Sequence, residues 1–293
     1  MANKLDNLNV KDFERILFEK GIPLIIGELI GKGGQKHVYS ARLSSDALKV
    51  VFKVMIPSVN TVERVKREIR ATTLINHPNI PKILNTNVDS SLKSGDLVWI
   101  IEEFIPGDSL RALLSSGRIF NIKELIDFID TMLSILSQSE KLSIVHRDIK
   151  PENIIVGKDT KFWLIDFGIS RHLDLESLTS SGSPVGPHTI GYSASEQFRN
   201  RKKDIDIRAD LFSLGVVSAE MIIGHNPYWE GTYNVLQLIK KIEKQPLPIL
   251  RIAGDSQFFL ARFIKTLGDN RASRRPMNID SAIRIFNLVK KSL

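Results

Sequence analysis

The chain has 293 residues, which suits one large or two modest domains and is enough for a substantial core without disulfides. It contains no cysteine, which excludes a disulfide scaffold, a Cys-ligated zinc site and a thiolate nucleophile. Its net charge of +8 is mild and gives no reason to expect specific nucleic-acid binding. No apolar run approaches the roughly 18 residues of a membrane span, and residues 1–10 lack the apolar core of a secretory signal. We therefore expect a cytoplasmic protein with no membrane partner.

The first part of the sequence predicts one helix followed by an antiparallel sheet. Val10, Phe13 and Leu17 recur at helical spacing, so we expect an amphipathic helix over residues 10–20. Short segments rich in apolar and β-branched residues come next and predict an antiparallel meander, at 24–30, 37–43 and 48–55. A further helix and two further strands are expected at 61–75, 80–88 and 97–105.

The sequence becomes mostly helical after Pro106. A long apolar stripe runs at helical spacing from Ile122 to Leu136 and predicts a buried helix face. The stretch 176–188 is rich in Ser, Gly and Pro and is typical of a mobile loop. Two short strands are predicted at 154–156 and 162–165, and a long helix at 206–223. Three further helical stretches complete the chain. A mainly β portion is therefore expected up to about residue 105, and a mainly α portion after it.

Two features of the β portion point to a phosphate-bearing ligand. Gly31, Gly33 and Gly34 lie between two predicted strands, where glycines let backbone N–H groups approach phosphate oxygens. Taken alone, an ordinary glycine-rich turn is the more common explanation. Lys53 lies in the third strand among apolar residues, and an inward-pointing lysine needs an anionic partner. Glu68 on the following helix is one candidate, although it could instead pair along its own helix surface.

The most informative string is His-Arg-Asp-Ile-Lys-Pro-Glu-Asn at residues 146–153. It places the carboxylate of Asp148, the ammonium of Lys150 and the carboxamide of Asn153 within six residues. Thirteen residues later comes Asp166, followed by Phe and Gly. Mg²⁺ is usually held by one or two carboxylates together with substrate phosphates. The string and its spacing therefore predict activation of a hydroxyl group beside a magnesium–phosphate complex.

From about Leu24 to about Leu288 the sequence resembles the eukaryotic-type serine/threonine protein kinases. The resemblance implies an α+β bilobal fold, with a small mainly-β N-lobe that carries one regulatory helix and a larger mainly-α C-lobe. It implies an N-terminal extension at 1–23, the N-lobe at 24–105 and the C-lobe at 106–293. It also implies ATP and Mg²⁺ as cofactors and a protein Ser or Thr hydroxyl as the acceptor.

The resemblance assigns roles to the residues that match the family's catalytic motifs. Asp148 accepts the proton of the substrate hydroxyl, and Asn153 and Asp166 hold the metal. Lys150 is the mark of the serine/threonine type and lies near the γ-phosphate, where it stabilises developing charge. Lys53 holds the α- and β-phosphates.

The resemblance also outlines the nucleotide pocket in the N-lobe. Glu68 is the ion-pair partner of Lys53, and Glu103 and Ile105 offer backbone hydrogen bonds to adenine. The remaining positions against the nucleotide are Ile30, Gly31, Gly33, Gly34, Val38 and Val51.

Structural and regulatory roles follow in the C-lobe. Asp210 anchors the catalytic loop, and Glu196 pairs with Arg275. The stretch from Asp166 to Glu196 resembles the family's activation segment. Arg147 matches the arginine that often couples to a phosphorylated activation segment, so we expect autophosphorylation within this stretch. The other interpretation is a loop that is merely flexible. The candidate regulatory hydroxyls are Ser177, Thr179, Ser180, Ser181, Ser183 and Thr189.

Several positions depart from the family pattern, among them His188, which replaces a glycine. Lys36 replaces the third glycine of the loop, Val51 replaces an alanine, and Ser195 replaces a proline. Glu102 lies at the back of the nucleotide pocket, where a carboxylate needs a hydrogen-bonding or cationic partner. These departures keep an alternative open, a kinase-fold nucleotide-binding scaffold with little turnover. A third possibility keeps the chemistry but transfers phosphate to a small molecule or RNA.

Overall fold

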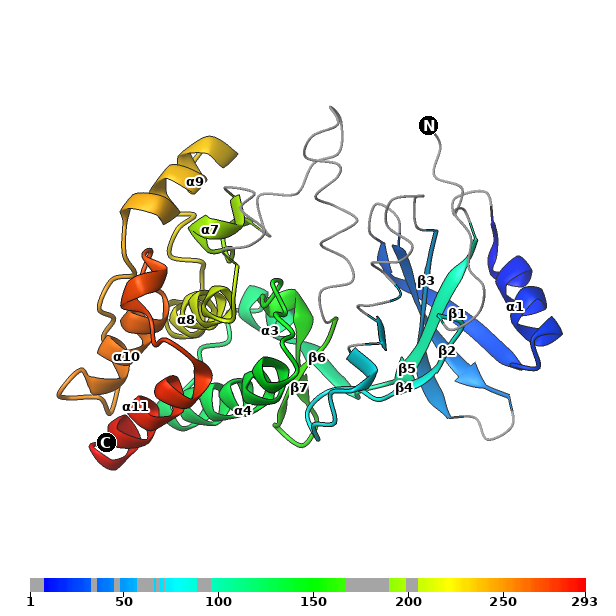
Figure 1. The fold of residues 1–293 in the computed structure, drawn as a ribbon, viewed down its shortest axis with the longest axis horizontal. Coiled ribbons are helices and arrows are strands. Elements are labelled where there is room, and N and C mark those ends of the chain that lie inside the picture. The colour runs from blue at the N-terminus through cyan, green and yellow to red at the C-terminus, as the bar shows by residue number, and fades with distance from the viewer. Residues whose placement is uncertain are drawn as a thin grey trace. The chain divides into compact units, whose positions relative to one another are not determined.

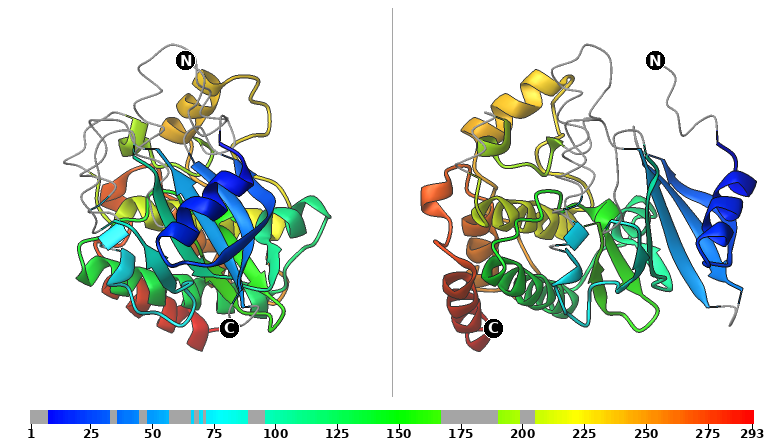
Figure 2. Two further views of the ribbon diagram at one scale, coloured as in Figure 1. Left: turned by 90° about the vertical axis from the view of Figure 1, so that its right-hand side faces the viewer. Right: turned by 45° about the vertical axis from the view of Figure 1, so that its right-hand side comes forward.

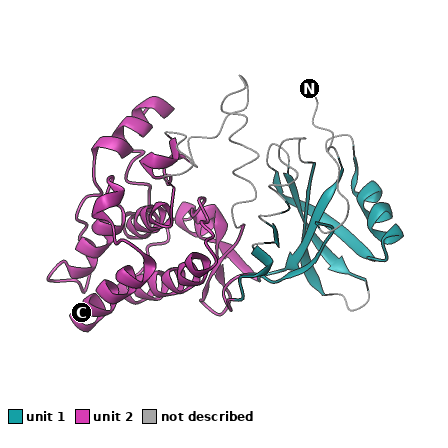
Figure 3. Ribbon diagram, viewed as in Figure 1, with its two compact units in different colours: residues 1–76, 81–105, 169–184 teal, residues 77–80, 106–168, 185–293 magenta. Residues whose placement is uncertain are grey.

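The computed structural model describes residues 8–32, 36–44, 48–56, 66, 69–70, 72–88, 96–166, 190–198 and 205–293 (Figure 1). The chain divides into two compact units (Figure 3). Unit 1 comprises residues 1–76, 81–105 and 169–184, and unit 2 comprises residues 77–80, 106–168 and 185–293. Among the described residues, no helix combines the length and apolarity that crossing a membrane requires.

Unit 1 is built on a five-stranded antiparallel sheet with the strand order β1-β2-β3-β5-β4. Its first three strands form the predicted meander, because each pairs with the next along the chain. The fifth strand then inserts between the third and the fourth. The strands are β1 (Leu24–Lys32), β2 (Lys36–Leu43), β3 (Lys49–Met55), β4 (Ile83–Thr86) and β5 (Val98–Glu103).

Helix α1 (Val10–Glu19) covers one face of this sheet (Figure 2). Asn9 and Asp12 form a reciprocal capping box that fixes the start of the helix. Phe13 and Leu17 are fully buried and pack in one cluster with Phe52 and other apolar residues of the strands. The predicted N-terminal helix is therefore part of the core of unit 1.

The opposite face of the sheet carries a second apolar cluster. Met55, Val98 and Ile100 pack there with Ile69, which belongs to the helical stretch after β3. Because side chains alternate along a strand, Lys53 on β3 and Glu102 on β5 share this face.

Unit 2 is mainly helical around one central helix, α8 (Arg208–Ile223). Every residue from Ala209 to Met221 is buried, as expected for a helix that is surrounded on all sides. At Gly215 a Cβ atom would lie 2.5 Å from the backbone nitrogen of Gly268, so glycine lets the chain after α10 approach α8 closely. The other helices are α3 (Leu110–Ser115), α4 (Ile122–Lys141), α7 (Ser195–Phe198), α9 (Val235–Lys244), α10 (Phe259–Leu267) and α11 (Ile279–Lys291).

A small three-stranded sheet completes unit 2, with the order β6-β7-β8. Its strands are β6 (Gly107–Ser109), β7 (Ile154–Gly157) and β8 (Phe162–Leu164). The sequence predicts β7 and β8 but not β6, because three residues of Gly, Asp and Ser carry no β-strand signal. The short 3-10 turn η2 (Pro151–Asn153) directly precedes β7.

The predicted fold class is confirmed, because one unit is a mainly antiparallel sheet and the other is mainly helical. Two predicted segments fall largely outside the described residues. Of the helix predicted at 61–75, only residues 66, 69–70 and 72–73 are described as helical. The loop predicted at 176–188 lies entirely outside them.

The packing of α1 generates a stability prediction. We expect Phe13→Ala to lower the free energy of unfolding by about 3–5 kcal/mol, because it opens a cavity beneath the sheet. Phe18→Ala on the same helix is the matched control, since Phe18 is 73% exposed. Denaturant unfolding measures both, and equal losses would show that α1 does not belong to the core.

Candidate active site

The segment 146–153, called the catalytic loop below, lies in unit 2, and its backbone is held by the buried carboxylate of Asp210. Its Oδ2 accepts from the amide of His146 and its Oδ1 from the amide of Arg147, each at 2.7 Å. Arg147 has a left-handed backbone with φ of 64°, a conformation that costs about 1–3 kcal/mol in a non-glycine residue. The two hydrogen bonds that this fully buried carboxylate accepts offset the strain and fix the direction in which the loop continues.

Asp148, Lys150 and Asn153 converge at the end of this loop. Lys150 Nζ lies 2.9 Å from Asp148 Oδ2, and Asn153 Nδ2 donates to the same oxygen at 3.0 Å. Asn153 Nδ2 also donates to the backbone carbonyl of Asp148 at 2.8 Å. Both side-chain contacts thus fall on Oδ2 among the described residues, which leaves Oδ1 of Asp148 as the oxygen that can accept a hydroxyl proton.

His146 fastens the catalytic loop to the end of β8. Its Nδ1 accepts from the amide of Asp148 at 3.3 Å, and its Nε2 lies 3.2 Å from the carbonyl oxygen of Ile165. These partners require a neutral ring with the proton on Nε2. Desolvation by complete burial lowers the pKa of His146 to about 4, outweighing the opposing pull of Asp148, so the ring is neutral at pH 7.

Asp166 lies two residues after the end of β8 and is half-buried, with a left-handed φ of 60°. The neighbouring Ile165 amide donates to the backbone carbonyl of Asn153 at 2.9 Å. The two candidate metal ligands are therefore joined through the backbone of Ile165.

These ligands suit Mg²⁺. The amide nitrogen of Asn153 is occupied by Asp148, so its Oδ1 is the atom available to a cation. Among the described residues, no three His, Asp or Glu side chains gather around one metal position. A cation held by Asn153 and Asp166 would need phosphate oxygens as further ligands, which is the usual manner of Mg²⁺ binding.

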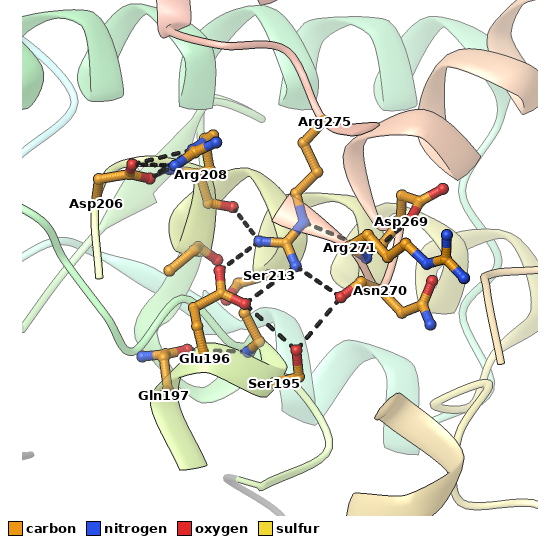
Figure 4. Close-up of polar contacts among 12 residues, drawn as sticks. Ser195, Glu196, Gln197, Asp206, Arg208, Ser213, Asp269, Asn270, Arg271 and Arg275 are labelled. Carbon is orange, nitrogen blue, oxygen red and sulfur yellow. Dashed lines mark hydrogen bonds and ion pairs between the residues drawn. The ribbon is translucent and has the colours of Figure 1, made fainter. Parts of the chain in front are cut away.

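A buried ion pair between Arg275 and Glu196 anchors the segment 190–198. Arg275 Nη1 lies 2.6 Å from Glu196 Oε1, and Arg275 also donates from Nε to the carbonyl of Asp269 at 2.7 Å (Figure 4). Its guanidinium carbon is 5.0 Å from the centre of the Phe212 ring on α8. Ser195, which stands where the family usually has proline, donates to the carbonyl of Asn270 at 3.3 Å. This departure therefore adds a polar contact to the anchor.

Gln197 connects the same segment to the catalytic loop. Its Oε1 accepts from the amide of Ala194 at 3.0 Å, and its Nε2 donates to the carbonyl of Arg147 at 3.2 Å. The backbone of Arg147 is consequently held from two sides, by Asp210 through its amide and by Gln197 through its carbonyl.

An arginine-centred cluster adds a further connection. Arg111 on α3 donates from Nε to Glu152 Oε1 and from Nη1 to Glu220 Oε1, both at 2.8 Å. It also contacts the hydroxyl of Tyr192, which in turn donates to Glu220. Burial, reinforced by the charge of Glu220, raises the pKa of Tyr192, so its hydroxyl keeps the proton that it donates. Arg111 thus joins the catalytic loop, the segment 190–198 and α8.

Within unit 1, Lys53 has a partner that the sequence did not assign to it. Lys53 Nζ lies 2.5 Å from Glu102 Oε2, and both side chains are buried. Glu68, the partner expected from the resemblance, lies outside the described residues. Glu102 was recognised from the sequence only as a carboxylate in need of a partner.

The other predicted nucleotide positions lie along the strands of unit 1. Gly31 pairs with Val38 across β1 and β2, and Val51 pairs with Glu102 across β3 and β5. Ile30 lies on β1, Glu103 ends β5, and Ile105 follows it. Outside the described residues lie Gly33, Gly34, Ser177, Thr179, Ser180, Ser181, Ser183 and Thr189.

Comparison with known families accounts for this arrangement. Residues 24–277 match the family described as protein kinase domain. The chain belongs to this family. The kinase domain is 32% identical over 211 residues to a probable serine/threonine-protein kinase PknB of Bifidobacterium longum, covering 69% of this chain and 30% of that protein.

Two other relatives are also named serine/threonine-protein kinases. Serine/threonine-protein kinase PknB of Mycobacterium tuberculosis is 30% identical over 256 residues, which are 85% of this chain and 40% of the relative. Serine/threonine-protein kinase pkn3 of Myxococcus xanthus is 31% identical over 261 residues, 84% of this chain and 46% of the relative. The chain therefore spans between 30% and 46% of the length of these curated relatives.

Several residues of this kinase domain escaped the sequence analysis. Glu152 lies inside the recognised string, but nothing in the sequence connects it with Arg111, which is an isolated arginine on a six-residue helix. Tyr192 and Gln197 lie near the recognised Glu196, although their partners are 81 and 50 residues distant in sequence. Only the fold reveals such contacts.

The anchor at Arg275 generates the second prediction. We expect Arg275→Met to lower the free energy of unfolding by about 3–5 kcal/mol, because it leaves the Glu196 carboxylate without its buried partner. Arg15→Met is the control: Arg15 lies 3.6 Å from Asp12, its side chain is 71% exposed, and its loss should cost less than about 1 kcal/mol. Similar losses in the two variants, measured by denaturant unfolding, would contradict a special role for the anchor.

The third prediction concerns pH. Because the pKa of His146 falls from 6.5 to about 4 on folding, the unfolded chain binds more protons between these values. The contribution of His146 to stability is therefore complete above pH 6.5 and decreases as the pH falls, by about 2 kcal/mol at pH 5.

Denaturant unfolding of His146→Asn at pH 7 and pH 5 tests this prediction. The difference in stability between the two pH values should shrink by that amount relative to the unmodified protein. His225→Asn, which replaces an exposed histidine of the same unit, should leave the difference unchanged. An unchanged difference in His146→Asn would contradict the prediction.

Proposed function

We propose that this kinase domain transfers the γ-phosphate of ATP to Ser and Thr hydroxyls of proteins in a Mg²⁺-dependent reaction. The observation that carries the proposal is the arrangement around Asp148. Lys150 and Asn153 both bind its Oδ2, so the carboxylate is held in one orientation and Oδ1 is left for the acceptor. The names of the curated relatives support the serine/threonine class.

The chain's own residues perform positioning and charge stabilisation in this proposal. Asp148 Oδ1 accepts the hydrogen bond of the acceptor hydroxyl, orients its oxygen toward the γ-phosphorus in line with the leaving group, and receives the proton. Lys150, 2.9 Å from that carboxylate, stabilises negative charge on the transferred group. Mg²⁺ held by Asn153 and Asp166 would supply charge neutralisation at the phosphate oxygens. Lys53 holds the α- and β-phosphates.

The proposed partners are ATP and a protein that carries the acceptor Ser or Thr. The scaffold alternative finds little support, because Lys53, Asp148, Lys150, Asn153 and Asp166 are all present. Transfer to a small molecule or RNA would keep the same residues and change only the acceptor.

We further propose autophosphorylation among the hydroxyls between Ser177 and Thr189. The contact of Gln197 with the carbonyl of Arg147 supports this idea, because it gives the segment that follows these hydroxyls a direct connection to the catalytic loop. A phosphorylated segment paired with the Arg147 side chain would act on that connection.

The fourth prediction tests the transfer itself. Purified protein is incubated with γ-labelled ATP and Mg²⁺, with and without a generic basic protein, and the labelled sites are mapped by mass spectrometry. We expect Asp148→Asn to reduce the rate roughly a hundred- to ten-thousand-fold, because it removes the general base. Asp166→Asn should also abolish labelling. The control is Asp130→Asn, which changes a half-exposed aspartate of α4 that pairs with Lys290 and should leave transfer intact.

Each outcome has a distinct meaning. Label on Ser or Thr that depends on Asp148 and Asp166 supports the protein kinase. Thermal stabilisation by ATP without any labelled product would instead support the scaffold. ATP hydrolysis with no labelled protein would point to another acceptor. Labelling that leaves Ser177–Thr189 bare would contradict the proposed autophosphorylation sites.

A further inference from the structure

The buried pair of Lys53 and Glu102 is created by the pairing of two neighbouring strands. In the register of β3 and β5, Val51 is opposite Glu102 and Lys53 is opposite Ile100. Lys53 and Glu102 are therefore diagonal neighbours on one face of the sheet, within reach of each other. Lys53 Nζ lies 2.5 Å from Glu102 Oε2, and the two side chains are only 5% and 11% exposed.

Packing alone does not explain a carboxylate at this position. The same face of the sheet carries Met55, Val98 and Ile100 in an apolar cluster. An apolar side chain at residue 102 would extend that cluster without the cost of desolvating a charge. Since a buried carboxylate is tolerated only with a partner, the chemical role of Glu102 lies in its contact with Lys53.

The contact with Glu102 restricts the conformations of the Lys53 side chain. Its long side chain has many rotamers, and fixing them when a ligand binds weakens the binding. Glu102 engages one of the three N–H donors of the ammonium group and so orders the side chain before any nucleotide arrives.

The contact between Glu102 and Lys53 is held in place by the pairing of β3 and β5. Paired residues join β3 and β5 continuously from Val50 opposite Glu103 to Met55 opposite Val98. Glu102 is thus fixed relative to Lys53 by the sheet itself, and its contact does not depend on the placement of any separate helix.

We propose that Glu102 is a positioning residue that holds Lys53 ready to bind the α- and β-phosphates of ATP. This inference rests on the proposed function, in which Lys53 contacts those phosphates. It assigns to a departure from the family pattern a role in the affinity for nucleotide.

Steady-state kinetics of two variants test the proposal. In Glu102→Met the KM for ATP should rise about tenfold, the loss expected for one charge-assisted contact that orders the lysine. The KM for the protein acceptor should not change, and kcat should fall by less than about threefold, because the contact acts mainly on nucleotide binding. Glu102→Gln keeps an oxygen that accepts from Lys53 Nζ, so its KM for ATP should lie between those of Glu102→Met and the unmodified protein. Circular dichroism and the Glu102→Gln variant separate a kinetic effect from a failure to fold.

A double-mutant cycle tests the pair without any need for activity. Lys53→Met leaves a buried carboxylate without this cation, so its melting temperature should fall, and adding Glu102→Met should restore much of the loss. The matched control is the cycle of Lys290 and Asp130, whose side chains lie 2.7 Å apart but are 29% and 47% exposed. That cycle should show almost no coupling.

The outcomes separate this inference from the proposed function. Strong coupling together with an unchanged KM for ATP in Glu102→Met would make the pair purely structural and overturn the proposal. Tighter ATP binding in either Glu102 variant would mean that the carboxylate competes with phosphate for Lys53, which also overturns it. If calorimetry found no binding of Mg²⁺–ATP to the unmodified protein, the proposed function would fail and the positioning role with it, even if the coupling persisted.

Discussion

One buried carboxylate determines the shape of the catalytic loop. Asp210 accepts two backbone amides at 2.7 Å and thereby holds Arg147 in a left-handed conformation that it would otherwise avoid. The carboxylate lies in the first turn of α8, a helix buried on every side, so its position is fixed by the core of unit 2. The orientation of Asp148 directly after Arg147, and with it the contacts to Lys150 and Asn153, depends on this constraint.

The sequence predicted those parts of the molecule whose signals are local. The string at 146–153 brings the predicted catalytic groups together within a few residues. Segments rich in β-branched residues and later helical spacing predicted a mainly β portion followed by a mainly α portion. Contacts between residues that are distant along the chain could not be predicted from the sequence. Glu102 was recognised as needing a partner, yet choosing Lys53 required the register of β3 and β5. Arg111 gave no signal at all, because its partner Glu220 is 109 residues away along the chain.

The segment 190–198 is held by several independent contacts. Glu196 binds Arg275, Gln197 binds the Arg147 carbonyl, and Tyr192 joins the cluster of Arg111. Each contact reaches a different element, so the segment has little freedom to rotate as a body. This segment of the kinase domain is therefore ordered by polar contacts and not by apolar packing alone. Ser195 takes part in this order by donating to the carbonyl of Asn270.

The family match and the physical domain have different boundaries. The match covers residues 24–277, whereas α1 ends at Glu19 and α11 begins at Ile279. Both helices nevertheless cover apolar surface: Phe13 packs on the sheet of unit 1, and Phe286 stacks on Phe263 at 5.1 Å between ring centres. A protein trimmed to the matched residues would expose both surfaces to solvent and to its own copies. Aggregation of such a shortened protein would result from the loss of α1 and α11, and it would give no information about the candidate catalytic residues.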